Sequence, residues 1–220
     1  AQVALGEIAA YTKGKNIAVL VGVPVRYGNS LYNCAAVLVN GVIAGLVPKT
    51  HIANYNEFYE KRWFASGADL GSPRDIEICG QKTKIGRMLF DLGSGAVLGV
   101  ELCEDLWVPD PPSGSLCVSG ANLIANLSAS DEYVSKAQYR KQLVSGQSAR
   151  CVCGYVYVGA SVFESTTDLL FGGALFIAEN GGMLAEGERF LRQTNLIYSD
   201  LDIEKLNALR VKNMSFENSA

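Results

Sequence analysis

Cys103 is the residue of this sequence best placed to act as a nucleophile. It ends the apolar run AVLGVELC at 96–103, and the letters EDLW follow it directly. A cysteine at the end of a strand is held by rigid backbone, and the N-terminus of a following helix favours the thiolate. Single cysteines are mostly small buried core residues, however, and position alone favours that interpretation of Cys103.

Lys49 and His51 are two other residues whose side chains suit catalysis. Lys49 follows Pro48 at the end of a predicted hairpin, where a fixed ammonium would stabilise a developing oxyanion. A lysine in such a place is usually solvated, and without further context that alternative is favoured. His51 is the only histidine, which excludes a multi-histidine metal site and leaves any Cys–His pair to this one residue. We favour an ordinary loop residue for His51 and predict no metal site.

Three further motifs are interpreted as structural. The segment HIANYNEFYEKRWF at 51–64 holds five aromatic residues and predicts an ordered loop, with the wall of a small-ligand pocket as the alternative. Cys151 and Cys153 have the spacing of two core thiols on one face of a strand. The glycines of PPSGSLCVSG at 111–120 lack the lysine and hydroxyl residue of a phosphate-binding loop. No nucleotide site is therefore predicted in this chain.

Composition narrows the class of protein. The chain has 220 residues, of which 49% are hydrophobic and 19% charged, as expected of a globular protein with a full core. Its formal charge is −3 without a basic tract, so nothing favours a nucleic-acid partner. No apolar run approaches the roughly 20 residues of a membrane helix, so no membrane partner is predicted either. The six cysteines form no C-x-x-C pairs, which favours reduced thiols and a cytoplasmic location.

Hydrophobic periodicity predicts one α/β domain over residues 1–220 that mixes hairpins with strand–helix–strand units. The hairpins require antiparallel pairing, so a purely parallel sheet is not expected. The predicted elements are a helix over 1–15 with Ala4, Ile8 and Tyr11 inward, a strand at 17–25 buried on both faces, a hairpin over 32–49 turning at Asn40-Gly41, a hairpin over 82–103 turning at 93–95, a helix at 111–119, a strand at 122–127, a helix at 131–150 capped by Ser130 or Asp131, a strand at 155–163, a hairpin over 174–187, a strand at 195–199 and a helix at 202–212.

Six segments, in order along nearly the whole chain, resemble the glutaminase domain of glutamine-dependent NAD synthetases, a branch of the nitrilase (carbon–nitrogen hydrolase) superfamily. The pairing of VPK and NEFYEKRWF with ELCEDLW is specific to this branch. The segments are GVPV at 22–25, YNCAAVLVNGVIAGLVPK at 32–49, NYNEFYEKRWF at 54–64, GVELCEDLW at 99–107, NLSASDEYVSKAQYR at 126–140 and FGGALFIAENGGMLAEGERF at 171–190.

The resemblance implies roles for individual residues. Cys103 matches the nucleophile, Lys49 the catalytic lysine and Glu60 a second glutamate near the same site. Five further residues match positions that line the glutamine pocket: Tyr55, Glu104, Trp107, Ser130 and Lys136. Lys136 stands where an arginine also occurs in the family.

The resemblance also carries expectations about fold and partners. It implies an α-β-β-α sandwich whose first strand is missing, because the family's general-base glutamate lies upstream of the first helix and Glu7 does not match it. A C-terminal synthetase domain, which would use ATP and Mg, is expected to follow in the family and is missing here. The expected partners are glutamine, that synthetase domain and further copies of the chain in a homo-oligomer. No cofactor is expected in this domain.

Two alternatives to a glutamine amidohydrolase remain open from the sequence. One is a stand-alone nitrilase-type amidase acting on another small amide, against which the NAD-branch motifs argue. The other is a catalytically inactive fragment that keeps the fold, because the chain as given lacks the expected base.

Overall fold

The fold was analysed in a computed structural model, which describes residues 1–217 and 219. The chain forms two compact units, residues 1–90 and residues 91–220, which are described separately. The single domain predicted over 1–220 stays a prediction. Helices in the described part of the chain are all too short or too polar to span a bilayer.

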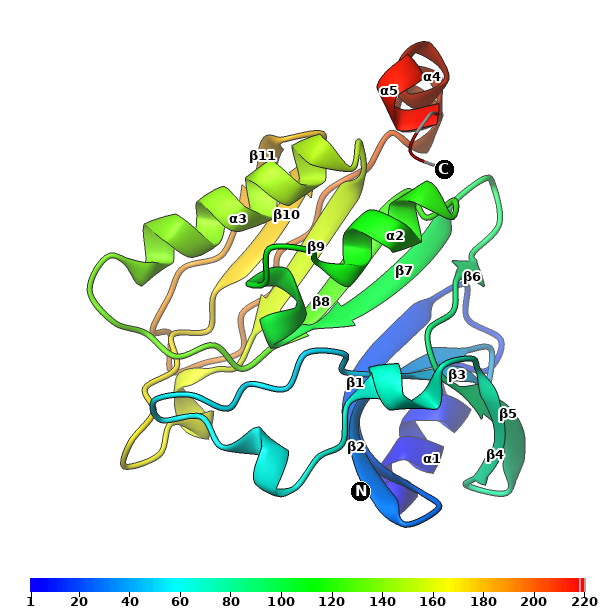
Figure 1. The fold of residues 1–220 in the computed structure, drawn as a ribbon, viewed down its shortest axis with the longest axis vertical. Coiled ribbons are helices and arrows are strands. Elements are labelled where there is room, and N and C mark those ends of the chain that lie inside the picture. The colour runs from blue at the N-terminus through cyan, green and yellow to red at the C-terminus, as the bar shows by residue number, and fades with distance from the viewer. Residues whose placement is uncertain (218, 220) are drawn as a thin grey trace. The chain divides into compact units, whose positions relative to one another are not determined.

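The first unit is a five-stranded sheet with one helix, α1 (Figure 1). The strand order is β1-β2-β3-β5-β4, antiparallel except between β3 and β5. Its elements are α1 (Gln2–Tyr11), β1 (Ala18–Tyr27), β2 (Ser30–Val39), β3 (Val42–Pro48), β4 (Arg74–Ile78) and β5 (Gln81–Ile85), with 3₁₀ turns at Glu60–Arg62 and Gly67–Leu70.

The helix α1 packs on this sheet through Leu5 and Ala9, which join a core made of alternate strand residues such as Cys34 and Leu38. The helix itself is where the periodicity predicted it, but the predicted inward face is wrong. Ala4, Ile8 and Tyr11 are exposed, because the face of the helix that joins the core is that of Leu5 and Ala9.

The strand β1 differs from its prediction in burial. It stands at the edge of the sheet and buries alternate residues, including Val23 and Val25, rather than both faces. The hairpin that follows is confirmed. Its turn residues Asn40 and Gly41 have φ of 49° and 85°, the left-handed pair that a two-residue hairpin requires.

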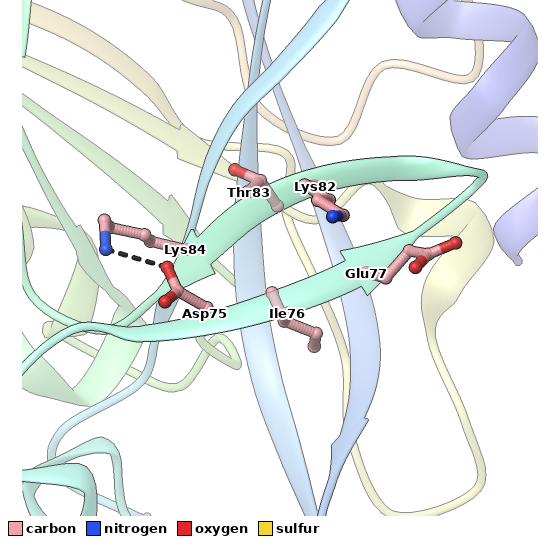
Figure 2. Close-up of a pocket in the computed structure, with 6 residues that line it drawn as sticks. All are labelled: Asp75, Ile76, Glu77, Lys82, Thr83 and Lys84. Atoms are coloured by element: carbon pink, nitrogen blue, oxygen red, sulfur yellow. Dashed lines mark hydrogen bonds and ion pairs between the residues drawn. The ribbon is translucent and has the colours of Figure 1, made fainter.

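The hairpin of β4 and β5 forms the other edge of the sheet and carries a shallow hollow lined by charged side chains (Figure 2). Lys84 and Asp75 pair across the two strands at 2.8 Å, and both are largely exposed. The Lys84 ammonium, mainly through its hydrogen bond, lowers the pKa of the Asp75 carboxyl. Charged side chains along an edge strand discourage pairing with another chain, so a protective role explains this surface.

The second unit is a six-stranded sheet of order β11-β10-β9-β8-β7-β6, with β7, β8 and β9 parallel and β9, β10 and β11 antiparallel (Figure 1). Its strands are β6 (Phe90–Asp91), β7 (Val97–Leu102), β8 (Leu123–Ser128), β9 (Gly154–Gly159), β10 (Leu175–Glu179) and β11 (Gly182–Glu186). Its helices are α2 (Pro112–Val118), α3 (Lys136–Arg150), α4 (Ile203–Lys212) and α5 (Met214–Glu217), with 3₁₀ turns at Cys103–Leu106 and Val162–Glu164.

The parallel strands are joined by helical crossovers, α2 between β7 and β8 and α3 between β8 and β9. Both crossovers step the same way across the sheet, so right-handed connections put both helices on one face, as Figure 1 shows. The segments that follow β7 and β8 therefore leave the sheet at the same edge. Cys103 and Ser130 lie in these two segments, at the edge where open α/β sheets bind ligands.

Several predicted boundaries in this unit are wrong. The helix predicted at 131–150 begins at Lys136, because Asp131 instead forms a β-bridge with Phe171, so neither Ser130 nor Asp131 caps it. The hairpin predicted over 82–103 keeps its turn, but residues 81–85 pair with β4. No strand forms at 195–199. The mixed α/β class with two sheets is confirmed.

Candidate active site

Cys103 sits at a sharp corner between β7 and a short 3₁₀ turn, Cys103–Leu106. Its φ is +45°, a left-handed conformation that is strained for any residue except glycine and that concentrates at functional sites. The expected strand-end position is thus confirmed, but the element that follows is a 3₁₀ turn rather than an α-helix. The side chain is half-buried, so a small molecule has access to the thiol.

Side-chain acceptors hold the backbone of this corner. The N–H of Leu102 donates to Asp105 Oδ2 at 3.0 Å, and the N–H of Cys103 donates to Asn126 Oδ1 at 3.1 Å. Asp105 and Asn126 are both buried, and buried hydrogen bonds of this kind fix the geometry they connect. Because both amides are engaged, the donors that face a substrate oxyanion must come from other groups.

Tyr157 of β9 also lies near the thiol. Burial first, and the charge of Cys103 second, raise the pKa of its hydroxyl, which donates to Ser128 Oγ at 2.6 Å. The hydroxyl therefore stays protonated at physiological pH and adds no charge near the thiol.

Lys49 and Glu60 form a buried ion pair in the first unit. Lys49 is 2% exposed, which rules out the solvated lysine favoured by its position alone. Glu60 also accepts from the Asn33 side chain at 3.2 Å and from the Ala53 N–H at 3.1 Å, so the loop between the two partners closes on this carboxylate. The structure thus brings two of the three predicted catalytic residues together.

The backbone around Lys49 is fixed as tightly as its side chain. The Lys49 N–H donates to Asn33 O at 2.8 Å, and the Gly67 N–H donates to Lys49 O at 2.7 Å. A Cβ on Gly67 would lie 2.7 Å from Pro48 O, so only glycine allows this approach. Tyr55 occupies the same loop, half-exposed and edge-on to Phe58 with ring centroids 5.9 Å apart.

Trp107 and Lys136 form an aromatic and cationic cluster in the second unit. The Lys136 ammonium lies 5.1 Å from the Trp107 ring centroid and 4.7 Å from that of Tyr133, and it pairs with Asp131. The Trp107 ring also packs on Tyr139 at 5.6 Å. Glu104 is half-buried in the turn that ends at Trp107, whose N–H donates to Glu104 O at 2.9 Å. The cluster therefore presents a fixed ammonium, already paired with Asp131, beside two aromatic rings.

Ser130 is buried and lies against Arg140 of α3. The Arg140 guanidinium donates to Ser130 O and Oγ at 3.4 Å each and to Asp131 O at 2.8 Å, and it pairs with Glu132 at 2.6 Å. Arg140 is 1% exposed, so the chain places a full charge in its interior to hold this segment. Ser130 is therefore positioned by its neighbours rather than being a helix cap.

Sequence reasoning missed the residues that support these side chains: Glu101, Asp105, Asn126, Asp131, Glu132, Arg140 and Tyr155. The available signal was polarity where a buried strand demands apolar residues. Glu101 interrupts the apolar run before Cys103, and Asn126 interrupts the one at 122–127. Buried polar groups of this kind need partners and often belong to a site.

The predicted pair of core thiols, Cys151 and Cys153, is confirmed as buried, but they lie in the turn between α3 and β9 rather than on a strand face. All six cysteines are free thiols. Within residues 1–217 and 219, no group of three or more histidine, cysteine, aspartate or glutamate side chains is placed to hold a metal ion.

Comparison with known proteins gives close relatives over most of the chain. The chain is 40% identical over 203 residues to the glutamine-dependent NAD(+) synthetase of Mycobacterium tuberculosis, an alignment that covers 91% of this chain and 30% of the relative. It thus spans about a third of the length of that relative. No protein-family model matches the chain.

Solved structures give the same result for the fold. A glutamine-dependent NAD(+) synthetase from Cytophaga hutchinsonii superposes with a TM-score of 0.77 at 30% identity, covering 89% of this chain and 31% of that one. A carbon–nitrogen hydrolase from Helicobacter pylori G27 superposes with a TM-score of 0.71 at 20% identity, covering 95% of this chain and 73% of that one. The resemblance inferred from the motifs is therefore confirmed, and the fold is that of the nitrilase superfamily.

Proposed function

We propose that this chain, which is homologous to glutamine-dependent NAD synthetases over most of its length, hydrolyses the side-chain amide of glutamine and supplies the ammonia for NAD synthesis. The observation that carries the proposal is the corner at Cys103. A thiol held in a strained conformation by buried hydrogen bonds, within the segment GVELCEDLW that resembles the family motif, is the arrangement a covalent amidohydrolase needs.

In the proposed reaction a general-base glutamate, of the kind that the family resemblance implies, takes the proton from the Cys103 thiol, and the thiolate attacks the amide carbon of glutamine. The tetrahedral oxyanion collapses to a thioester as the same base returns its proton to the departing ammonia. Water, activated by that base, then hydrolyses the thioester to glutamate and regenerates the thiol. Lys49 supplies positive charge to the oxyanion, and Glu60 holds the lysine ammonium in place through their ion pair. A donor to such an oxyanion is typically worth roughly 3–4 kcal/mol.

The cluster around Lys136 is proposed to recognise the substrate. Its ammonium, held by Asp131 and two aromatic rings, suits the α-carboxylate of glutamine, and Glu104 suits the α-ammonium. Trp107 and Ser130 of the second unit complete the proposed pocket, and the family resemblance implies a role in glutamine binding for Tyr55. A neutral amide without an α-carboxylate would lose the charge interaction, which favours glutamine over a simple aliphatic amide.

The proposal includes the wider setting of the relatives. The ammonia is passed to a C-terminal synthetase domain in a homo-oligomeric cytoplasmic protein, where ATP and Mg²⁺ serve the amidation of deamido-NAD. Hydrolysis of glutamine on this chain requires neither. The reaction needs only the thiol, the lysine and a proton acceptor.

The test separates amide cleavage from amidation in the protein at its full natural length. We expect Cys103→Ala to abolish glutamine hydrolysis while NAD formation from free ammonia persists. Cys79→Ala, which changes a thiol in the other unit, is the matched control and should leave both activities intact. Glutaminase activity in Cys103→Ala would reject the proposal. Faster cleavage of amides that lack an α-amino acid group would favour the stand-alone amidase instead.

A further inference from the structure

Glu101 is a carboxyl group fully inside the second unit, two residues before Cys103 on β7. Its Oε2 accepts from the Ser113 N–H at 2.8 Å, and its Oε1 accepts from the Tyr155 hydroxyl. Tyr155 in turn accepts from Asn126 Nδ2 at 3.2 Å. Asn126 Oδ1 holds the N–H of Cys103, so a hydrogen-bonded chain connects Glu101 to the candidate nucleophile.

The donor and acceptor of every hydrogen bond in this series follow from the groups at its two ends. The N–H groups of Cys103 and Ser113 can only donate. The oxygen of the Asn126 amide must therefore face Cys103, which turns its NH₂ group towards Tyr155. The Tyr155 hydroxyl must then donate onwards, and both oxygens of Glu101 are left as acceptors. Only an ionised Glu101 satisfies every hydrogen bond in this series.

Burial opposes that ionised form. Desolvation is the largest effect and raises the pKa of Glu101 to about 7, against hydrogen bonds from Tyr155 and Ser113 that lower it. The titratable groups that act on Glu101 are Tyr155 from β9 and Asp105 from the turn after Cys103, whose negative charge also raises the pKa. A charge kept in the interior at this cost indicates a role beyond packing.

We propose that Glu101 is a positioning residue, which through Tyr155 and Asn126 holds the backbone amide of Cys103 and keeps the thiol in its left-handed corner. Protonated Glu101 would donate to the Tyr155 oxygen, whose own proton would then meet the Asn126 NH₂ group. The Asn126 amide can relieve that conflict only by rotating, which withdraws the acceptor from Cys103. The chain of bonds thus transmits the state of Glu101 to the nucleophile. This inference rests on the proposed function of Cys103.

Glu101→Gln tests the proposal in the full-length protein, because glutamine keeps the shape but offers one acceptor to two donors. We compare kcat/KM for glutamine between wild type and variant from pH 5.5 to 9. Dividing the wild-type kcat/KM by that of the variant at each pH cancels the titration of groups that both proteins share. We expect the wild type to be roughly tenfold faster at pH 8, the effect of one lost hydrogen bond, and the two rates to converge below pH 6.

Two further variants complete the design. Tyr155→Phe removes the hydroxyl that links Asn126 to Glu101. The wild-type to variant ratio of kcat/KM should therefore follow the same pH curve, and the double variant Glu101→Gln/Tyr155→Phe should be no slower than either single variant. Glu179→Gln is the matched control, because Glu179 is a buried carboxylate of the same unit whose hydrogen bonds, from the Asp202 N–H and the Lys205 ammonium at 2.7 Å each, connect it to the start of α4 instead of to Cys103. Its ratio should stay near one at every pH.

A ratio independent of pH, or additive losses in the double variant, would show that Glu101 only supports the fold and would overturn the proposal. If Glu101→Gln does not fold, the Tyr155→Phe ratio decides. If neither variant folds, the hydrogen bonds from Glu101 to Cys103 serve folding rather than positioning, and the proposal is rejected. Failure of the underlying function is distinguishable, since Cys103→Ala would then still hydrolyse glutamine.

Discussion

The Lys49 ammonium and the Glu60 carboxylate form an ion pair in which the lysine is almost completely removed from solvent. The pair is not isolated, because Glu60 keeps two further donors from Asn33 and Ala53. A buried charge without its partner is costly, so the loss of either residue of the pair would leave the other uncompensated. The loop that joins them is ordered by the same contacts.

Lys49→Met should therefore lower stability as well as turnover. Breaking a buried pair typically costs about 3–5 kcal/mol, and the remaining donors to Glu60 favour the lower end. The double variant Lys49→Met/Glu60→Gln should recover most of the stability, because no unpaired charge remains, yet stay inactive. Denaturant unfolding and glutaminase assays measure the two effects. A loss of turnover under about tenfold would remove Lys49 from catalysis.

Gly67→Ala should displace the backbone at Pro48 and Lys49. The added Cβ would meet the Pro48 carbonyl at 2.7 Å, and backbone cannot move aside as a flexible side chain can. We expect a loss of roughly 1–3 kcal/mol, as in other overpacked sites, and a fall in turnover through Lys49. Gly22→Ala is the control, because a Cβ there meets nothing within 4 Å. Equal melting temperatures for the two variants would contradict the expectation.

Stability should depend on pH through Glu101. Its pKa is raised from 4.5 in the unfolded chain to about 7 in the folded protein, so between these values the folded state holds a proton that the unfolded state has lost. The free energy of unfolding should then fall as pH rises from about 4.5 to 7, by an amount on the order of 3 kcal/mol.

Glu101→Gln should remove this pH dependence. Relative to wild type, the free energy of unfolding of the variant should therefore rise as pH increases over the same range. Glu7→Gln, at an exposed position on α1, provides the control and should show a constant difference. Denaturant titrations at pH 4.5, 6 and 8 are sufficient. A parallel pair of curves for Glu101→Gln would mean that the carboxyl titrates normally.

Thiol labelling should separate access from acidity. Cys103 and Cys79 are half-buried, whereas the other four cysteines are buried. Hydrogen bonds from the Cys117 and then the Cys153 thiols lower the pKa of Cys151, yet its side chain is out of reach. Because an alkylating reagent needs contact as well as a thiolate, we expect iodoacetamide to modify Cys103 and Cys79 first. Mass spectrometry of the native protein would refute this if Cys151 were labelled as fast.

The local signals in the sequence were sufficient to predict the hairpins and the order of the main elements. Asn40-Gly41 fixes its turn by backbone chemistry alone, and the apolar runs at 96–103 and 122–127 lie in β7 and β8. The inward face of α1 and the start of α3 were wrong, because both are decided by partners distant in sequence. Asp131 leaves the helical pattern to pair with Phe171, and no local rule anticipates that contact.

For the candidate site, too, some residues were predictable from the sequence and others were not. The family resemblance assigned catalytic roles to Cys103, Lys49 and Glu60, whereas position alone favoured a core thiol and a solvated lysine. The structure pairs Lys49 with Glu60, and the catalytic roles stay predictions. The supporting residues could not be found, because Asn126 and Glu101 act through hydrogen bonds that only the register of β7, β8 and β9 creates.

The contrast between the two sheets has a consequence for the order in which the chain folds. In the first sheet Tyr27 pairs with Ser30 across a tight turn, whereas in the second Leu98 pairs with Leu123 only after a whole helix has been placed. Closing a short loop costs less entropy, and local contacts form sooner. We expect amide protons of β2 to gain protection from exchange before those of β8 during refolding; the reverse order would contradict this. Until then β7, which ends next to Cys103, lacks its β8 partner, and this is the interval in which a folding chain is most exposed to aggregation.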